Sequence, residues 1–247
     1  MAEKWLEGRV LENRHWTETL FSLRVAAPPL SFEAGQFVRI ALDVGGTRVA
    51  RAFSFVNPPH DPVLEFYGVV VPEGPLSPRL ARLAPGDALC VAPNPAGFLV
   101  LSEIPDAETL WLVSTGTGIA PFLSILRSEA PWQRFRNVVL VHAVRRAPEL
   151  VYRETIERIR QARKNLKYVT FVSRESRAGS LSGRIPDAVR DGRLPAAAGC
   201  ELSAHSSQVM LCGNPQMLRD ASAALVERGL RKHRRRSPGH ISVESFW

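Results

Sequence analysis

Cysteine is scarce in this sequence. The 247 residues include three, Cys90, Cys200 and Cys212, and no two of them form a C-x-x-C pair. An iron–sulfur cluster on four thiolates, a cysteine-based zinc site and a disulfide framework each need more cysteines or closer spacing. A four-cysteine cluster is therefore excluded, and we expect no resident metal ion.

Long uncharged hydrophobic runs are also missing. The longest stretch without a charged residue, 109–126, carries Ser114, Thr115 and Thr117 at its centre, where lipid would leave their polar groups unpaired. The first nine residues contain scattered charges where a secretory signal peptide needs an apolar segment. The sequence predicts a cytoplasmic protein without a membrane span.

Acidic residues are outnumbered by basic ones, 24 against 32, and the formal net charge is +8. This balance favours an anionic ligand or an acidic partner. The densest basic cluster, residues 232–236, suits nucleic-acid binding, docking of an acidic protein or, most commonly, a solvated surface. Because no nucleic-acid-binding module accompanies it, we expect no nucleic-acid partner.

The first half of the chain has the pattern of short antiparallel strands. Alternating segments at 21–25, 36–42, 50–56 and 64–71 are separated by turn sequences rich in glycine and proline. Closely spaced strands of this kind are typical of a β-barrel or sandwich.

The second half has a different period. Apolar runs at 110–114, 138–142, 168–172 and 209–212 alternate with helical patterns, of which 149–164 and 216–227 are the clearest, and 194–206 has the composition of a loop. Alternating strands and helices predict a doubly wound parallel sheet. We therefore expect two domains, an antiparallel β-barrel at 1–100 and an α/β domain at 101–247.

Two turns could hold phosphate groups. Ser77 followed by Pro78 is typical of a helix N-cap, although most such starts bind no ligand. The sequence Thr115-Gly116-Thr117-Gly118 lies between an apolar strand and a helix, where glycines allow a diphosphate to approach the backbone. A tight turn without a ligand is the alternative interpretation.

Other polar residues follow the predicted strands of the second half. Arg145, Arg174 and Arg184 each come after a β run, and arginine binds two phosphate oxygens at once. Cys212 ends the last strand, either as a buried small residue or at a ligand crevice. The chain ends on Phe246 and Trp247, which either anchor in a core or cover a flat ligand such as flavin.

Taken together, these motifs resemble the ferredoxin–NADP reductases over essentially the whole chain, and the bacterial flavodoxin/ferredoxin–NADP reductases most. The resemblance rests on ordered motifs and the aromatic end: Arg51-Ala52-Phe53-Ser54, Gly74-Pro75-Leu76-Ser77, Gly116-Thr117-Gly118-Ile119-Ala120-Pro121, Gly179-Ser180-Leu181-Ser182-Gly183-Arg184 and Cys212-Gly213-Asn214-Pro215. It implies an FAD-binding barrel followed by an NADP-binding α/β domain.

The resemblance also implies an activity and a site. NADPH would give a hydride to non-covalently bound FAD, and the electrons would pass singly to an acidic ferredoxin or flavodoxin, with the protein acting as a monomer. The catalytic group would consist of Ser54, Cys212, Glu244 and Phe246. The FAD site would consist of Arg51, Ala52, Phe53, Ser54, Tyr67, Val69, Pro75, Leu76, Ser77, Thr117, Phe246 and Trp247. The NADP site would consist of Thr115, Gly116, Thr117, Gly118, Arg145, Ser173, Arg174, Arg184, Gly213, Asn214 and Asp220.

Two residues depart from the family pattern. Phe53 stands where tyrosine is common, so a hydroxyl that could bond FAD is absent. Pro75 has no N–H and leaves Leu76 and Ser77 to supply amides in that loop.

Three other functions stay open at this point. The chain could be an NAD(P)H-dependent flavin reductase or the reductase component of an oxygenase, although the three arginines favour NADP. From a different class, it could be a non-catalytic flavin-binding electron-transfer subunit. A basic protein that binds nucleic acid is the third.

Overall fold

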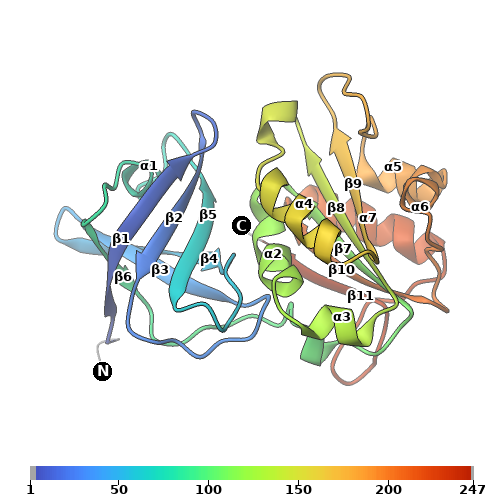
Figure 1. Cartoon of the computed structure of the whole chain (residues 1–247), viewed down its shortest axis with the longest axis horizontal. Coiled ribbons are helices and arrows are strands. Elements are labelled where there is room, and N and C mark those ends of the chain that lie inside the picture. The colour runs from blue at the N-terminus through green and yellow to red at the C-terminus, as the bar shows by residue number, and fades with distance from the viewer. Residues whose placement is uncertain (1–3, 246–247) are drawn as a thin grey trace.

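The protein consists of two β-sheets side by side, the second covered by helices on both faces (Figure 1). The computed structural model describes residues 4–245. Phe246 and Trp247, which the family resemblance assigns to the FAD site, lie outside the described residues. Within 4–245, no helix combines the length and hydrophobicity that crossing a bilayer requires.

The first sheet is antiparallel and curls into a half-barrel, as predicted. Its strand order is β4-β3-β6-β1-β2-β5, and Phe55, just after β4, pairs with Phe66 of β5 at the opposite edge. The elements are β1 Leu6–His15, β2 Leu20–Ala26, β3 Phe37–Val44, β4 Thr47–Ser54, β5 Val63–Val69, α1 Ser77–Leu80 and β6 Ala88–Val91.

Local sequence explains these strands. In β3, Val38 and Ile40 are buried and Arg39 between them is exposed, which is the alternation of a strand with one covered face. Gly45 and Gly46 connect β3 to β4 with φ angles of 57° and 78°. Left-handed backbone at both positions is the geometry of a tight two-residue hairpin, for which glycine is best suited.

The expected N-cap at Ser77 is wrong. Leu76 precedes α1, and Ser77 is already the first helical residue. The Ser77 hydroxyl instead accepts a hydrogen bond from the Val71 N–H at 2.9 Å, so it closes the preceding turn.

The second sheet is parallel, with the order β11-β10-β7-β8-β9. It agrees with the predicted doubly wound class. The elements are η1 Leu101–Glu103, β7 Thr109–Thr115, η2 Gly116–Ile119, α2 Ala120–Leu126, α3 Ala130–Arg134, β8 Asn137–Val144, η3 Ala147–Glu149, α4 Arg153–Ala162, β9 Leu166–Val172, α5 Ile185–Arg190, α6 Arg193–Ala198, β10 Ser207–Gly213, α7 Pro215–Glu227 and β11 Ile241–Ser245.

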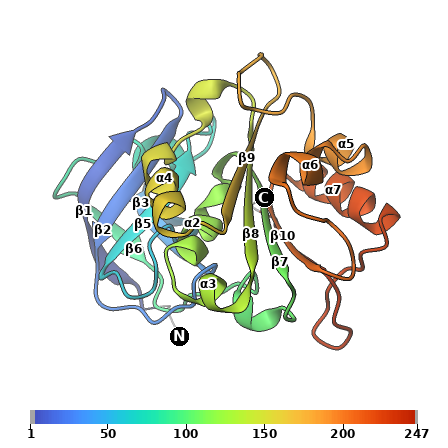
Figure 2. The same ribbon diagram turned by 45° about the vertical axis from the view of Figure 1, so that its right-hand side comes forward.

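Helices cover the two faces of this sheet unequally. The helices α2 and α4 lie on the face toward the half-barrel, and α5, α6 and α7 lie on the other (Figure 2). Their buried side chains belong to two separate core clusters, one for each face. The loop expected at 194–206 is wrong in its first part, because α6 occupies Arg193–Ala198. The helix expected at 149–164 is shorter, since Tyr152, with φ of 57°, breaks it from the preceding turn.

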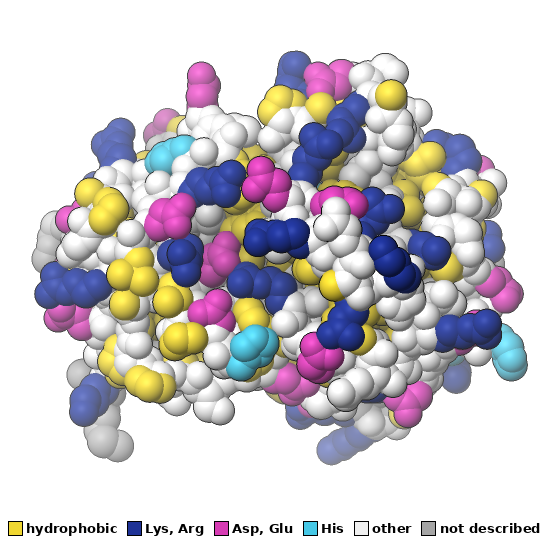
Figure 3. All heavy atoms as spheres, in the orientation of Figure 1, with side chains coloured by type: hydrophobic (Ala, Val, Ile, Leu, Met, Phe, Trp, Pro, Cys, Tyr) yellow, Lys and Arg dark blue, Asp and Glu magenta, His cyan; other side chains and the backbone are white. Residues whose placement is uncertain are grey.

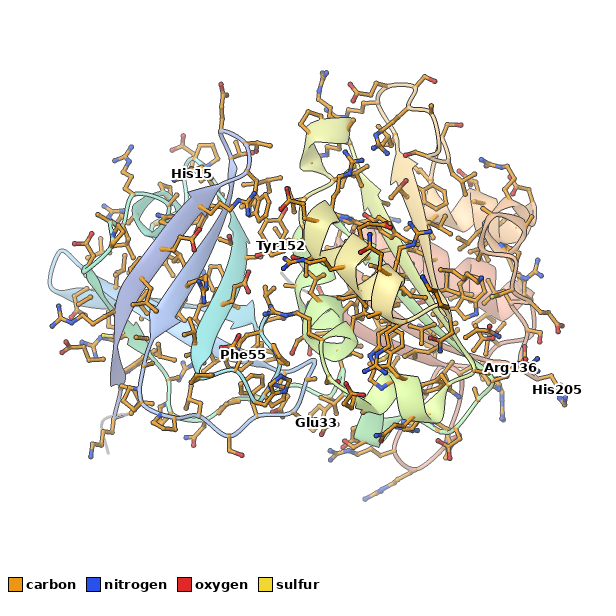
Figure 4. All side chains as sticks on the ribbon, viewed as in Figure 1. His15, Glu33, Phe55, Arg136, Tyr152 and His205 are labelled. Carbon is orange, nitrogen blue, oxygen red and sulfur yellow. The ribbon has the colours of Figure 1, made fainter. Side chains whose placement is uncertain are left out.

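The two halves share one core cluster. It joins Leu20, Val56 and Tyr67 of the half-barrel to Leu123 and Tyr152 of the other half. Figure 4 labels Tyr152 between β5 and α4.

Polar contacts add to this interface. The Ser124 hydroxyl donates to the Asn57 carbonyl at 2.7 Å, and the Arg127 guanidinium donates to Glu65 at 2.9 Å. The Arg127 guanidinium also donates to the Val56 carbonyl at 3.2 Å.

Candidate active site

The strand order of the second sheet marks where a ligand can bind. The chain runs outward from β7 to β8 and β9, then returns to place β10 on the other side of β7. The helix after β7 lies on one face and the helix after β10 on the other, so the loops at these two carboxyl ends diverge. Such a switch point is the usual ligand crevice of a doubly wound sheet.

At this crevice the backbones of two turns approach too closely for side chains. A Cβ atom on Gly118 would lie 2.4 Å from the carbonyl oxygen of Cys212, and one on Gly213 would lie 2.3 Å from Oγ1 of Thr115. The Asn214 N–H donates to the same Thr115 oxygen at 3.0 Å. The sequence-predicted turns at 115–118 and 212–215 therefore meet, and their glycines are required by this contact.

The second turn continues into a capped helix. The Asn214 side chain accepts hydrogen bonds from the N–H groups of Gln216 and Met217 and caps α7. Asp220 lies one turn further and accepts from the Gln216 side chain at 2.7 Å. Asn214 is thus at the crevice, whereas the carboxylate of Asp220 is already paired within α7.

A buried histidine supports the first turn, and the sequence analysis missed it. His142 is fully buried on β8, and its Nε2 lies 3.3 Å from the carbonyl oxygen of Gly116. Burial lowers the pKa of His142 to about 4, so the ring is neutral and Nε2–H donates to that carbonyl. Gly116 has a φ of 52°, and the hydrogen bond from the imidazole restrains this left-handed residue.

The predicted arginines separate into a pair and a single residue. The Arg174 N–H donates to the Arg145 carbonyl at 2.9 Å, and the Ser173 N–H donates to the Val144 carbonyl at 3.1 Å. Arg145, Ser173 and Arg174 therefore lie together beyond β8 and β9, and all three are exposed. Arg184 directly precedes α5 and is also exposed, but no hydrogen bond within the described chain joins it to the other two.

Cys212 and Glu244 are neighbours on β10 and β11, where they stand in register. Burial raises the pKa of the Cys212 thiol well above its usual value, and the Glu244 carboxylate raises it further. Cys212 is therefore a neutral packing group and not a thiolate nucleophile. Burial also raises the pKa of Glu244 to about 7.

The end of β11 reaches the half-barrel. A Cβ on Gly97 would lie 3.0 Å from Oε2 of Glu244, and Ala96 pairs with Phe37, which in turn pairs with Ser54 of β4. This series of neighbours brings the ends of β4 and β11, with Ser54 and Glu244, into one region of the molecule.

Three buried polar atoms in this region have no partner within residues 4–245: Oγ of Ser54, Oη of Tyr67 and Oε1 of Glu244. Buried polar groups nearly always find a partner, so these atoms indicate a missing polar ligand. Ser54 and Tyr67 are 2% and 4% exposed, so bulk water does not serve as the partner of their hydroxyls. A ring system carrying hydrogen-bonding edges, such as FAD, fits this donor set.

The remaining predicted FAD residues lie around the same sheet. Arg51 and Ala52 are exposed on β4, Phe53 is half-buried, and Val69 is half-buried against the shared core. The turn after β5 holds exposed Pro75, buried Leu76 and half-buried Ser77, and across the interface Thr117 is buried. Arg79 is exposed, and its guanidinium donates to the Pro75 carbonyl at 2.7 Å.

An aromatic group beside Tyr67 also escaped the sequence analysis. The Tyr152 ring meets the Tyr67 ring edge-on at 5.5 Å and the Trp16 ring at 4.7 Å. Tyr152 is the one non-glycine residue with positive φ among those described. Backbone in this region costs free energy, which packing at the interface offsets. Within 4–245, no group of three His, Cys, Asp or Glu side chains is arranged to hold a metal ion.

Comparison with known proteins agrees with this geometry. Residues 112–223 match the family of oxidoreductase NAD-binding domains. A flavodoxin/ferredoxin–NADP reductase from Shigella flexneri is 50% identical over 98% of this chain and 99% of its own length, and one from Escherichia coli is 49% identical with the same coverage. A ferredoxin NADP⁺ reductase from Neisseria gonorrhoeae, solved with bound FAD and NADP, superposes with a TM-score of 0.95 at 32% identity and covers 99% of both chains. Because relatives of this similarity align over nearly their whole length, the chain belongs to the flavodoxin/ferredoxin–NADP reductase family.

Proposed function

We propose that this chain is an FAD-dependent reductase that exchanges electrons between NADPH and a ferredoxin or flavodoxin. FAD binds to the half-barrel at 1–100, and NADP binds to the parallel-sheet half at 101–247. The observation that carries the proposal is that the glycine turns at 115–118 and 212–215 meet beside Cys212 and the half-buried Glu244, next to the half-barrel end that holds Ser54. The relatives' names and the bound ligands of the gonococcal enzyme support the same assignment.

The chain's own residues divide the work of binding. The unpartnered hydroxyls of Ser54 and Tyr67 would bind the flavin ring and the ribityl chain of FAD. Phe53 would cover an apolar face of the flavin ring. Arg51 and the amides of Leu76 and Ser77 face the FAD diphosphate. For NADP, the turn at 115–118 receives the diphosphate, while Arg145, Arg174 and Arg184 select the 2′-phosphate through charge-assisted hydrogen bonds.

At the reacting position, the protein orients groups and excludes water. When bound, FAD supplies the exchange between a two-electron hydride and single-electron steps. Cys212 presents a neutral thiol beside the nicotinamide site. Glu244, whose pKa of about 7 lies near neutrality, holds or releases a proton at Oε1.

The acidic electron carrier has a basic surface to meet. The hairpin at 231–241 holds the cluster 232–236, and Arg235 is fixed by Glu103 at 2.7 Å and by the Phe98 ring, whose centroid lies 4.3 Å from the guanidinium carbon. Phe98 is 66% exposed and follows Gly97, on which a Cβ would lie 3.0 Å from Oε2 of Glu244. A positive, partly apolar surface next to the reacting groups favours fast encounter with an acidic protein. Reversing the charges of this surface would therefore abolish electron transfer to the carrier and leave reduction of the flavin by NADPH intact.

The test is anaerobic stopped-flow with the FAD-loaded protein, NADPH or NADH, and purified ferredoxin and flavodoxin in separate experiments. We expect NADPH to bleach the flavin absorbance much faster than NADH does, and either carrier to restore it. Cys212→Ala should slow the bleaching by tenfold or more, while the matched variant Cys200→Ala should not change it. A protein that is colourless with excess FAD, or one that reduces only free flavins, would overturn the proposal.

A further inference from the structure

A polar groove lies between α4 and the strand β9. It has a volume of about 1070 Å³ and is lined by residues of α4, by Tyr168 and Thr170 of β9, and by Arg177 and Gly179 of the following loop. Its lining includes Leu150, Arg153, Arg158, Tyr168, Thr170 and Arg177. Arg145, Arg174 and Arg184, the residues proposed for the NADP 2′-phosphate, are not part of it.

Two hydroxyl-bearing residues of β9, Tyr168 and Thr170, line the groove, and Ser180 is hydrogen-bonded to Thr170. Oγ1 of Thr170 and Oγ of Ser180 are 2.7 Å apart, and the Arg177 guanidinium donates to the same Ser180 oxygen at 3.0 Å. Ser180 and Arg177 are thereby fixed against β9. Next to them, the buried Oη of Tyr168 has no hydrogen-bond partner among residues 4–245. A buried tyrosine hydroxyl usually has one, so this atom indicates a bound group that accepts a hydrogen bond.

Positive charge converges on that hydroxyl. Burial raises the pKa of Tyr168 to about 12, and the guanidiniums of Arg153, Arg177 and Arg160 oppose this rise, which shows that all three are close to the phenol. The phenol is therefore a neutral O–H donor at physiological pH. Lys and Arg side chains gather over α4 and its surroundings on the face shown in Figure 3.

The four arginines of the lining outnumber its two carboxylates, Glu154 and Glu157. Glu157 is paired with Arg160 at 2.9 Å, and Glu154 is the other carboxylate in the lining. Arg153 makes no hydrogen bond or ion pair with the rest of the described chain, and Arg158 bonds within α4, to the Glu154 carbonyl and Thr155. Arg153 and Arg177 are thus available to an anion, and they flank the unpartnered hydroxyl.

We propose that this groove binds a phosphate group, with Oη of Tyr168 and the guanidiniums of Arg153 and Arg177 as donors. Phosphate suits this set because it accepts several charge-assisted hydrogen bonds at once, and arginine binds two of its oxygens. The site lies on the α4 side of the sheet edge, apart from the turns at which the proposed function places NADP. The phosphate can belong to a mononucleotide or be free in solution, and both share this chemistry.

The test is isothermal titration calorimetry of the FAD-loaded protein saturated with NADP⁺, so that the coenzyme site is filled. Inorganic phosphate, 5′-AMP and 2′-AMP are the three titrants. We expect one further binding event that Arg177→Ala and Arg153→Ala each weaken by at least tenfold and Tyr168→Phe by about threefold. The matched variant Arg190→Ala removes an exposed, ion-paired arginine from α5 on the other face and should leave binding unchanged.

Equal affinity for the three titrants would support a site that recognises phosphate alone, and tighter binding of a mononucleotide would support a nucleotide site. No binding event under NADP⁺ saturation would overturn the proposal. So would binding that Arg177→Ala and Arg153→Ala leave intact. Arg177→Ala and Arg153→Ala should keep the wild-type KM for NADPH. A raised KM in either variant would assign the groove to the coenzyme site instead.

Discussion

Replacing Glu244 by glutamine should stabilise the protein, and only above about pH 5. Burial raises the pKa of Glu244 from the 4.5 of an exposed glutamate to about 7. The native state therefore binds this proton more tightly than the unfolded chain does, and native stability falls as the pH rises through this range. The difference between the two pKa values corresponds to about 3 kcal/mol of unfolding free energy.

The sign can be measured because glutamine keeps the shape without the charge. At pH 4.5 the wild type and Glu244→Gln should unfold with nearly equal free energies. By pH 8 the variant should be more stable by up to about 3 kcal/mol, since Glu244 must then be ionised in its buried site. Urea unfolding at a fixed excess of FAD, repeated from pH 4.5 to pH 8, gives this difference directly.

Glu227→Gln is the matched control. Glu227 is exposed, and the hydrogen bond from Arg190 lowers its pKa, so its removal should never stabilise the protein at high pH. If the wild type and Glu244→Gln lose stability in parallel across the range, the carboxylate of Glu244 is not desolvated. The role assigned to its proton would then be wrong.

Three further predictions follow from the same contacts. Gly118→Ala would place a Cβ 2.4 Å from the Cys212 carbonyl and should weaken NADP⁺ binding at least tenfold in difference-spectrum titrations; unchanged affinity would contradict the close approach of the two turns. Tyr67→Phe removes an unpartnered hydroxyl and should weaken FAD binding about fivefold by fluorescence titration, a net loss of about 1 kcal/mol. The control Tyr168→Phe, outside the proposed flavin site, should leave FAD binding unchanged. Equal effects of the two substitutions would refute the assignment of Tyr67. His142→Leu removes the donor to Gly116 and should weaken NADP⁺ binding about fivefold, with His142→Asn recovering part of the loss, and the effect should be constant from pH 6 to pH 8 because burial keeps the pKa of His142 near 4.

The parallel sheet was the most predictable part of the fold. Its strands are buried on both faces, so they read as continuous apolar runs, and the runs at 110–114 and 209–212 fall inside β7 and β10. The glycine turns were predictable for a related reason. A turn between a buried strand and a helix has few sequences that allow close backbone contact, and Gly118 and Gly213 are among them.

Elements that depend on distant partners were not visible in the sequence. The strand β11 was not anticipated, because it has five residues and forms through parallel pairing with β10, far away along the chain. The six-residue α6 is too short for a helical period to be read. The helix α1 was predicted from Ser77 and Pro78, and it begins one residue earlier than expected. Ser77 has the local sequence of an N-cap, but the Val71 N–H competes successfully for its hydroxyl.

The missed site residues are polar or aromatic side chains that resemble their apolar neighbours in a pattern. His142 ends the apolar run 138–142, and Tyr168 begins the run at 168–172, so each was taken as part of a strand. Tyr152 lies within the segment that was expected to be helical. These residues share one signal, a single hydrogen-bonding side chain within an otherwise apolar, buried segment. An analysis of hydrophobic periodicity does not detect this signal, although such a buried polar group needs a partner.

The contacts of α2 have a consequence for how the molecule can be divided. Ser124 of α2 donates a hydrogen bond to the loop after β4, and Arg127 at the end of α2 donates one to β5. The core cluster that the two halves share surrounds these contacts. Cutting the chain near residue 100 would expose an apolar surface on each fragment and leave the carbonyls of Val56 and Asn57 without their hydrogen-bond donors. The halves should therefore melt together in a single calorimetric transition, and nucleotide exchange has to proceed on a rigid scaffold without the halves swinging apart.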